Sequence, residues 1–198
     1  MTSDISITLA WIRLSQQPLR YAHVSWQPQL PIEIDTLSLD ARRALERQMC
    51  RALNLVPLTQ RDALQRGVGV GLISPAAHAT LLNTLLRLSK PDATPAATSS
   101  AAGQLAKMLG RLPLPWRPLH AVAHSVAGTE RLLSEQLAAR LCAAAAPMGE
   151  AWSSRWRLRF DRDLPLTEVR TTATQTWWGH VEDCLYQLHG DSEKLPCL

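Results

Sequence analysis

Two histidines four residues apart are the first candidates for chemistry in this sequence. His120 and His124 are spaced so that both can face one way on a helix, as zinc ligands do. No Glu follows His120, and no third ligand lies nearby in the sequence. We interpret the pair as half-buried histidines with bonded ring nitrogens. The alternative is a metal-binding enzyme that uses both of them.

A second candidate metal set lies near the C-terminus and combines His180, Cys184, His189 and Cys197. The first two are one helical turn apart, but His189 falls off their stripe. None of the four cysteines belongs to a CxxC pair, which is typical of reduced thiols in a cytosolic protein. We therefore expect neither a metal site nor a cofactor.

The glycine-rich segment Gly67-Val68-Gly69-Val70-Gly71 resembles a nucleotide-binding loop only in composition. Its spacing is GxGxG instead of GxGxxG, and the residues before it look helical. A phosphate-binding loop needs a strand before the glycines and a helix N-terminus after them. We expect a tight crossing of two segments, where bulkier residues would not fit.

Acidic pairs and nucleophile motifs give no sign of catalysis. Glu182-Asp183 and Asp161-Arg162-Asp163 lie in segments that we expect to be solvated, whereas paired catalytic carboxylates need a cleft. No GxSxG motif occurs, and no cysteine has a recognisable nucleophile context. We expect that the protein is not an enzyme and has no catalytic residues.

The elements that would position these residues are mostly helical. Period-two alternation over 5–11 predicts a strand, and the basic–apolar alternation of 155–160 predicts its partner. Ser38 and Ser74-Pro75 have the character of helix starts. Helical apolar spacing then predicts helices over 39–54, 75–88, 105–109, 119–146 and 177–188. The expected fold class is mainly α, with a small antiparallel strand pair.

Length and composition favour one domain. The chain has 198 residues, of which 46% are hydrophobic, so it can bury a core of its own. Residues 90–102 are rich in Pro, Ala, Thr and Ser, which is typical of a flexible connector. We expect a single domain over 1–198, interrupted by this connector.

Charge and hydropathy bear on partners and location. The net charge is +4, and the basic residues are spread along the chain, which favours an acidic protein partner over nucleic acid. Asp4 near the start is unlike the basic region of a secretory signal, and no apolar run is long enough to span a membrane. We expect a cytoplasmic protein that binds no nucleic acid and does not insert into a membrane.

Tryptophans and arginines supply the candidate partner-binding residues. The seven tryptophans lie mainly where one segment turns into the next, so we expect most of them to anchor the core. The adjacent pair in the closing helix is the exception, because one member is a candidate for an exposed partner anchor. The densest basic cluster, the three arginines between 155 and 159, adds further candidates. The candidate partner-binding residues are Trp177, Trp178, Arg155, Arg157 and Arg159.

Several segments together resemble one protein family. Ile12-Arg13-Leu14 followed by Pro18-Leu19-Arg20-Tyr21-Ala22-His23 resembles the N-terminal P-x-x-Y-x-H stretch of the SctK proteins, also called YscK or OrgA. The similarity continues through the middle helices to 114–119. It ends with Ala151-Trp152, which leads into an alternating Arg/Leu segment as it does in the family.

The SctK proteins are cytoplasmic accessory proteins of the sorting platform in bacterial type III secretion systems. The resemblance implies an adaptor, peripheral to the inner-membrane apparatus, that bridges an SctD-like inner-membrane ring protein to an SctQ-like platform protein. Such an adaptor supports the loading of secretion substrates. The alternatives are another interaction protein, such as a secretion chaperone, and a nucleic-acid binder that uses the arginine cluster. Secretion chaperones are usually acidic, whereas this chain is basic.

Overall fold

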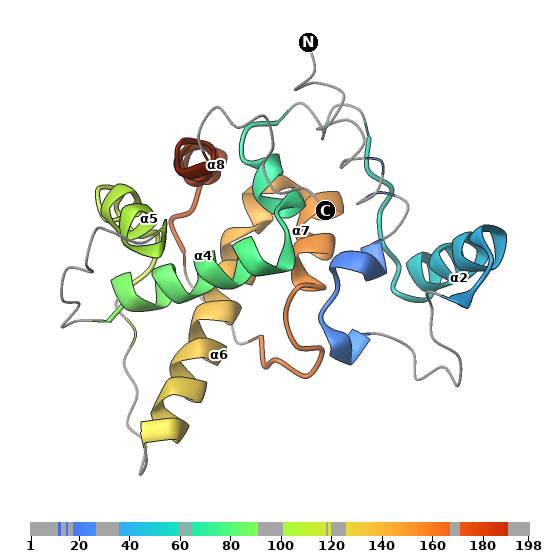
Figure 1. Cartoon of the computed structure of the whole chain (residues 1–198), viewed down its shortest axis with the longest axis horizontal. Coiled ribbons are helices and arrows are strands. Elements are labelled where there is room, and N and C mark those ends of the chain that lie inside the picture. Colours follow the sequence, from blue (N-terminus) through green and yellow to red (C-terminus); the bar gives the residue numbers. More distant parts are fainter. Residues whose placement is uncertain are drawn as a thin grey trace.

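The protein is mainly helical (Figure 1). The computed structural model describes residues 18–26, 36–59, 65–90, 101–117, 126–166 and 171–189, with the single positions 12, 15, 62 and 119. Within these ranges the chain contains no β-strand, so the expected strand pair is not seen. The α-helices are α2 Leu39–Ala52, α4 Pro75–Leu88, α5 Ala101–Leu109, α6 Val126–Ala144, α7 Glu150–Arg157 and α8 Gln175–His189. Of the short 3₁₀ turns, η1 Pro18–Tyr21 and η2 Val24–Trp26 precede α2, η4 Val68–Leu72 lies between α2 and α4, and η5 Ala146–Met148 lies between α6 and α7.

Side-chain caps start two of these helices where the sequence predicts them. The hydroxyl of Ser38 accepts a hydrogen bond from the Ala41 amide at 3.3 Å, at the start of α2. The hydroxyl of Ser74 accepts from the Ala77 amide at 3.2 Å, and proline occupies the first turn of α4. Each cap satisfies one amide that the helix itself cannot pair.

The strand expected over 155–160 is wrong, because α7 runs through its first half and a turn follows. Period-two alternation over six residues also fits a helix when the larger side chains recur every four positions. Trp152, Trp156 and Phe160 are spaced in this way, and all three are buried. The proposed partner strand, 5–11, lies outside the described residues.

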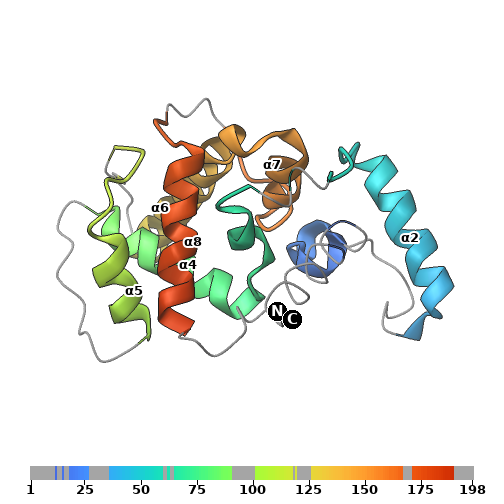
Figure 2. The same cartoon turned by 90° about the horizontal axis from the view of Figure 1, so that it is seen from above.

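The helices form a compact body with α2 at one side (Figures 1 and 2). Helix α4 contacts both α5 and α6, while α8 packs against α5 and covers η4. Helix α7 contacts α6, η4 and η5, which brings the C-terminal half onto the glycine loop. Helix α2 contacts η1 and lies apart from the central group in both views. The expected connector overlaps the start of α5 at Ala101, and residues 91–100 lie outside the described residues.

An aromatic cluster occupies the centre of the core. The rings of Trp152 and Trp156 stack with centroids 5.2 Å apart. Trp178 meets both rings edge-on, again at 5.2 Å. Trp177 extends the cluster from Trp178 to Trp116, whose ring centroid lies 5.4 Å away. These five tryptophans come from three segments, α7, α8 and the residues before α6, and all five are buried, so the expectation that most tryptophans anchor the core is confirmed.

Candidate functional site

Arg155 is a buried arginine that joins α7 to the segment after α2. Its side chain is only 4% exposed. Nη1 donates to the carbonyl oxygen of Val56 at 2.6 Å and to that of Ala151 at 2.8 Å. No carboxylate forms an ion pair with it among the described residues, and its Nε makes no hydrogen bond there. Burial lowers the pKa of the guanidinium, an effect opposed by Cys50 and Asp62.

Arg159 has the same character one helical turn later. The buried side chain donates from Nη2 to the carbonyl oxygens of Gly71 at 2.7 Å and Ile73 at 2.8 Å. Its guanidinium also lies over the ring of Tyr21, 5.5 Å from the centroid. Arg159 therefore fastens the end of the glycine loop to α7 and to the N-terminal 3₁₀ turn.

Arg157 points in a different direction and is half-buried. It lies over the ring of Trp26 at 5.2 Å and donates to the carbonyl oxygens of Asp161 at 2.6 Å and Arg162 at 2.8 Å. The three arginines therefore do not form one exposed basic surface. Their partner-binding role stays a prediction, and the structure gives each of them an internal contact.

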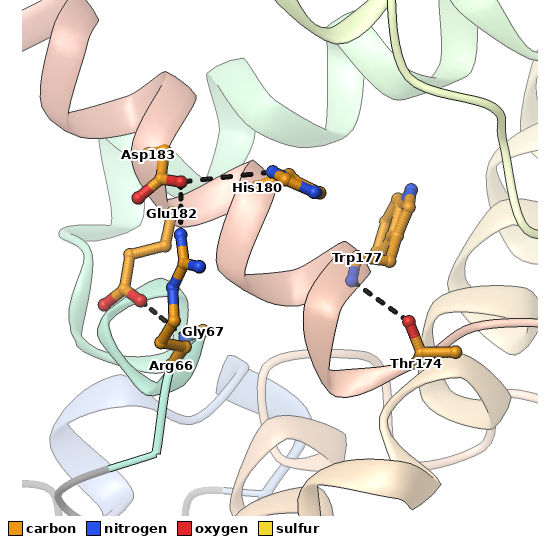
Figure 3. Close-up of polar contacts among 7 residues, drawn as sticks. All are labelled: Arg66, Gly67, Thr174, Trp177, His180, Glu182 and Asp183. Carbon is orange, nitrogen blue, oxygen red and sulfur yellow. Dashed lines mark hydrogen bonds and ion pairs between the residues drawn. The ribbon is translucent and has the colours of Figure 1, made fainter.

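The adjacent tryptophans of α8 are both buried. Trp177 is 7% exposed and Trp178 is 0% exposed, so the expectation that one of them is an exposed anchor is wrong. The Trp178 indole donates to the Ala144 carbonyl oxygen at 2.7 Å. The Trp177 amide bonds the Thr174 hydroxyl at 3.2 Å, which caps the start of α8 (Figure 3). A substitution of either tryptophan is therefore expected to destabilise the fold, which would obscure any effect on partner binding.

The glycine loop is the tight crossing that the sequence predicts. Gly67 has φ +89°, and a Cβ added there would lie 2.5 Å from Cβ of Trp178. A Cβ on Gly69 would collide with the carboxylate of Glu182, and one on Gly71 would lie 2.9 Å from the Trp152 indole nitrogen. Glycine is needed here because α8 and α7 press directly onto the loop backbone.

The carboxylate of Glu182 binds the amides of this loop. It accepts from the Gly67 amide at 2.5 Å (Figure 3) and from the Gly69 amide at 2.8 Å. Burial raises the pKa of Glu182, and these two amide donors oppose the rise. The expectation that Glu182 is solvated is therefore wrong. The sequence signal that could have revealed it is its position one turn after Trp178, on the face of α8 that packs inward.

Asp183, the neighbour of Glu182, makes exposed ion pairs instead. Arg66 donates to it at 2.6 Å, and His180 Nδ1 lies 4.0 Å from the same oxygen (Figure 3). These side chains are about half exposed or more, so the pairs contribute little stability. They align the loop before η4 with the outer face of α8.

The candidate metal ligands are only partly covered by the structure. Across the described ranges, no group of three or more His, Cys, Asp or Glu side chains could hold a metal ion. His180 faces solvent next to Asp183, and Cys184 is half-buried. His120, His124 and Cys197 lie outside the described residues, as does the side chain of His189.

His78 is a buried histidine that the sequence analysis did not single out. It lies edge-on to Trp156 and Phe160, with ring centroids 5.3 and 5.5 Å away. Burial and, secondly, the charge of Arg159 lower its pKa to about 3. The imidazole is therefore neutral at physiological pH and serves as part of the aromatic core.

An open pocket of about 700 Å³ lies between the end of α2 and α7. We call it the α2–α7 pocket. Three of its lining residues are arginines, and the others are polar, apolar or a thiol. The lining is Ser15, Arg47, Cys50, Arg51, Asn54, Leu55, Val56, Pro57 and Arg155.

The charged side chains among the described lining residues of the α2–α7 pocket are all basic, and Arg47 and Arg51 are exposed at i and i+4 on α2. Two carboxylates outside this lining also act on it, Glu46 on Cys50 and Asp62 on Arg155. Burial raises the pKa of the Cys50 thiol, which the charge of Arg155 partly offsets, so the thiol stays uncharged at neutral pH. Amides of the following turn already bond the carbonyls of Met49, Cys50 and Arg51 at the end of α2.

Comparison with known proteins gives no family for this chain. No protein-family model matches it, and neither a curated protein nor a solved structure shows a significant match. Among the described residues, no helix combines the length and apolar character that a membrane crossing requires.

Proposed function

We propose that this chain is a protein–protein adaptor of the SctK type, in a bacterial type III secretion sorting platform. In this role it bridges an SctD-like inner-membrane ring protein and an SctQ-like platform protein, in the cytoplasm, and supports substrate loading. The proposal comes from the sequence resemblance at 18–23, 114–119 and 151–160. The mainly helical fold is compatible with it.

The observation that best supports an adaptor is where the polar side chains are used. Arg155, Arg159 and Glu182 bond main-chain groups of distant segments, and the large aromatics pack on one another. These contacts join α7, α8 and the glycine loop to one another, and a preorganised surface binds a partner with a smaller entropic cost. The exposed arginines of α2 stand outside this internal network.

Co-expression with candidate partners tests the adaptor proposal. The full chain is produced with an SctQ-like protein and, separately, with the cytoplasmic domain of an SctD-like protein. Size-exclusion chromatography with light scattering then measures the mass of each mixture. A complex with each partner is the expected result. Monomeric elution of the chain in both mixtures, at concentrations well above micromolar, would contradict the proposal.

A further inference from the structure

The α2–α7 pocket carries an inference about which partner chemistry the chain recognises. Arg155 brings a buried positive charge to its wall, with two carbonyl oxygens as acceptors and no carboxylate in ion-pair range among the described residues. A buried charge is costly unless a counter-charge accompanies it. Asp62 acts on Arg155 from beyond ion-pair distance, so no carboxylate of the described residues contacts the guanidinium.

The rim of the pocket adds two more arginines without a paired carboxylate among the described residues. Arg47 and Arg51 are exposed, and neither has an ion-pair partner within the described part of the chain. The carbonyls at the end of α2 are bonded by amides of the next turn, so the two arginines are not needed as helix caps. Both guanidinium groups are available to a carboxylate from outside.

The remaining lining argues for a peptide and against a bare phosphate or a nucleic acid. Leu55, Val56 and Pro57 supply apolar surface beside the arginines, and none of the described lining residues is an aromatic ring on which a base could stack. An acidic segment that also carries an apolar side chain matches both features.

We propose that the α2–α7 pocket binds an acidic peptide segment of a protein partner. Its carboxylates pair with the exposed Arg47 and Arg51, the buried Arg155 adds positive charge at the wall, and an apolar side chain packs against the segment 55–57. The inference rests on the proposed adaptor function, because it names the chemistry of one partner. Arginine forks bind carboxylates with two parallel hydrogen bonds, which gives the contact direction as well as strength.

A labelled peptide tests the proposal directly. The probe is a short fluorescein-labelled peptide in which Glu and Leu alternate, and its control has Gln in place of every Glu. Fluorescence anisotropy with the full chain measures both dissociation constants at low and at physiological salt. We expect the Glu peptide to bind about tenfold or more tightly than the Gln peptide, with a preference that shrinks as salt rises. Equal binding of the two peptides would overturn the proposal.

Charge reversal locates the binding. Arg47→Glu and Arg51→Glu change exposed side chains of the pocket, and each should weaken binding of the Glu peptide about tenfold. Arg87→Glu is the matched control, because Arg87 is also exposed in the last turn of a helix but lies on α4, outside the lining. Circular dichroism confirms that all three variants fold. Equal weakening by Arg87→Glu, or none by the pocket variants, contradicts the pocket.

Two further outcomes separate this inference from the adaptor proposal. If the chain captures an SctQ-like or SctD-like protein and the Arg47→Glu and Arg51→Glu variants capture it equally well, the pocket inference fails and the adaptor function stands. If the Glu peptide binds through these arginines but neither protein is captured, the pocket stands and the adaptor function fails. Binding of a labelled thymidine oligonucleotide through the same arginines, without binding of the peptide, would also overturn the inference.

Discussion

Arg155 and Arg159 show how residues that look like a binding surface can serve the interior. Each places its guanidinium against carbonyl oxygens of a distant segment, and each is almost completely buried. An arginine fork suits this task because it offers several donors in one plane and never loses its charge. The carbonyls at Val56, Gly71 and Ile73 are thereby paired without a β-sheet.

Arg159→Met tests this role. The substitution leaves the carbonyl oxygens of Gly71 and Ile73 without their donor, and we expect it to lower the free energy of unfolding by about 2–4 kcal/mol. Urea denaturation followed by circular dichroism measures the loss. Arg162→Met is the control, since Arg162 is exposed, and should change stability by about 0.5 kcal/mol or less. Similar losses for the two variants would contradict the role of Arg159.

His78 gives the fold a pH dependence of definite sign. Its pKa is about 3 in the folded protein, below the usual 6.5, so the unfolded chain binds a proton that the folded chain refuses. Stability from this residue is fully present above pH 6.5 and falls as the pH drops toward 3, by about 1.4 kcal/mol per pH unit.

Comparison with His78→Leu isolates this contribution from that of the carboxylates. The unfolding free energies of the natural chain and the variant are measured by urea titration at several pH values below neutrality. The natural chain should lose stability more steeply with acid than the variant. Asn83→Leu is the control, because it changes an exposed residue of the same helix that does not titrate and should leave the slope as it is. Parallel slopes for the natural chain and His78→Leu would show that the imidazole is protonated in the folded state.

At the level of elements, the glycine loop and α8 form the closest contact between segments. Gly67 combines a positive φ with direct contact to the backbone of α8, whereas Gly149 has a similar φ of +87° and open space around it. Both positions strain the backbone of any other residue, and Gly67 adds steric exclusion by α8.

Gly149→Ala should cost about 1–3 kcal/mol, from backbone strain alone. Gly67→Ala should cost more, by about another 1–3 kcal/mol, because the new methyl overlaps Trp178 and α8 must move away. Thermal and urea denaturation of both variants provide the comparison. If Gly67→Ala proves the milder of the two, α8 and the loop are not in the close contact described above.

The sequence allowed the helices to be predicted better than the contacts between them. The caps at Ser38 and Ser74 are local in origin, so their residues specify them directly. The glycines at 67–71 indicate a close crossing, but their spacing does not say which helices cross there. The strand over 155–160 failed because six alternating residues are too few to separate period two from a spacing of four. A longer window that included Trp152 would have favoured a helix.

The candidate site was harder to predict for a physical reason. Arginine and glutamate are rarely buried, so the residue types of Arg155 and Glu182 favour a place on the surface. Their hydrogen-bond partners are main-chain carbonyls and amides, which every residue type has, so the sequence does not indicate which ones they bind. The α2–α7 pocket likewise joins residues about a hundred positions apart, so no local sequence pattern predicts it.

At the scale of the whole molecule, segments before and after the expected connector share one core. Helix α4 precedes it and contacts α5 and α6, which follow it, while the glycine loop lies beneath α8. The expectation of a single domain over 1–198 remains a prediction, and cooperative unfolding is its natural test.

Urea unfolding followed in parallel by tryptophan fluorescence and far-ultraviolet circular dichroism should give one coincident transition. The reason is that Trp116, Trp152, Trp156, Trp177 and Trp178 come from segments spread over the second half yet touch one another and pack against α4 and η4 residues. Two transitions with separate midpoints would mean that the parts on either side of the connector unfold independently.

The glycine loop has one further consequence. Two of its amides, those of Gly67 and Gly69, already bind an anion that belongs to the chain itself, the carboxylate of Glu182. A phosphate in solution would have to displace this carboxylate, and the effective concentration of a group on the same chain is one that a free solute rarely reaches. The Glu182 carboxylate therefore disfavours phosphate binding at this loop, which the glycine-rich sequence alone would suggest.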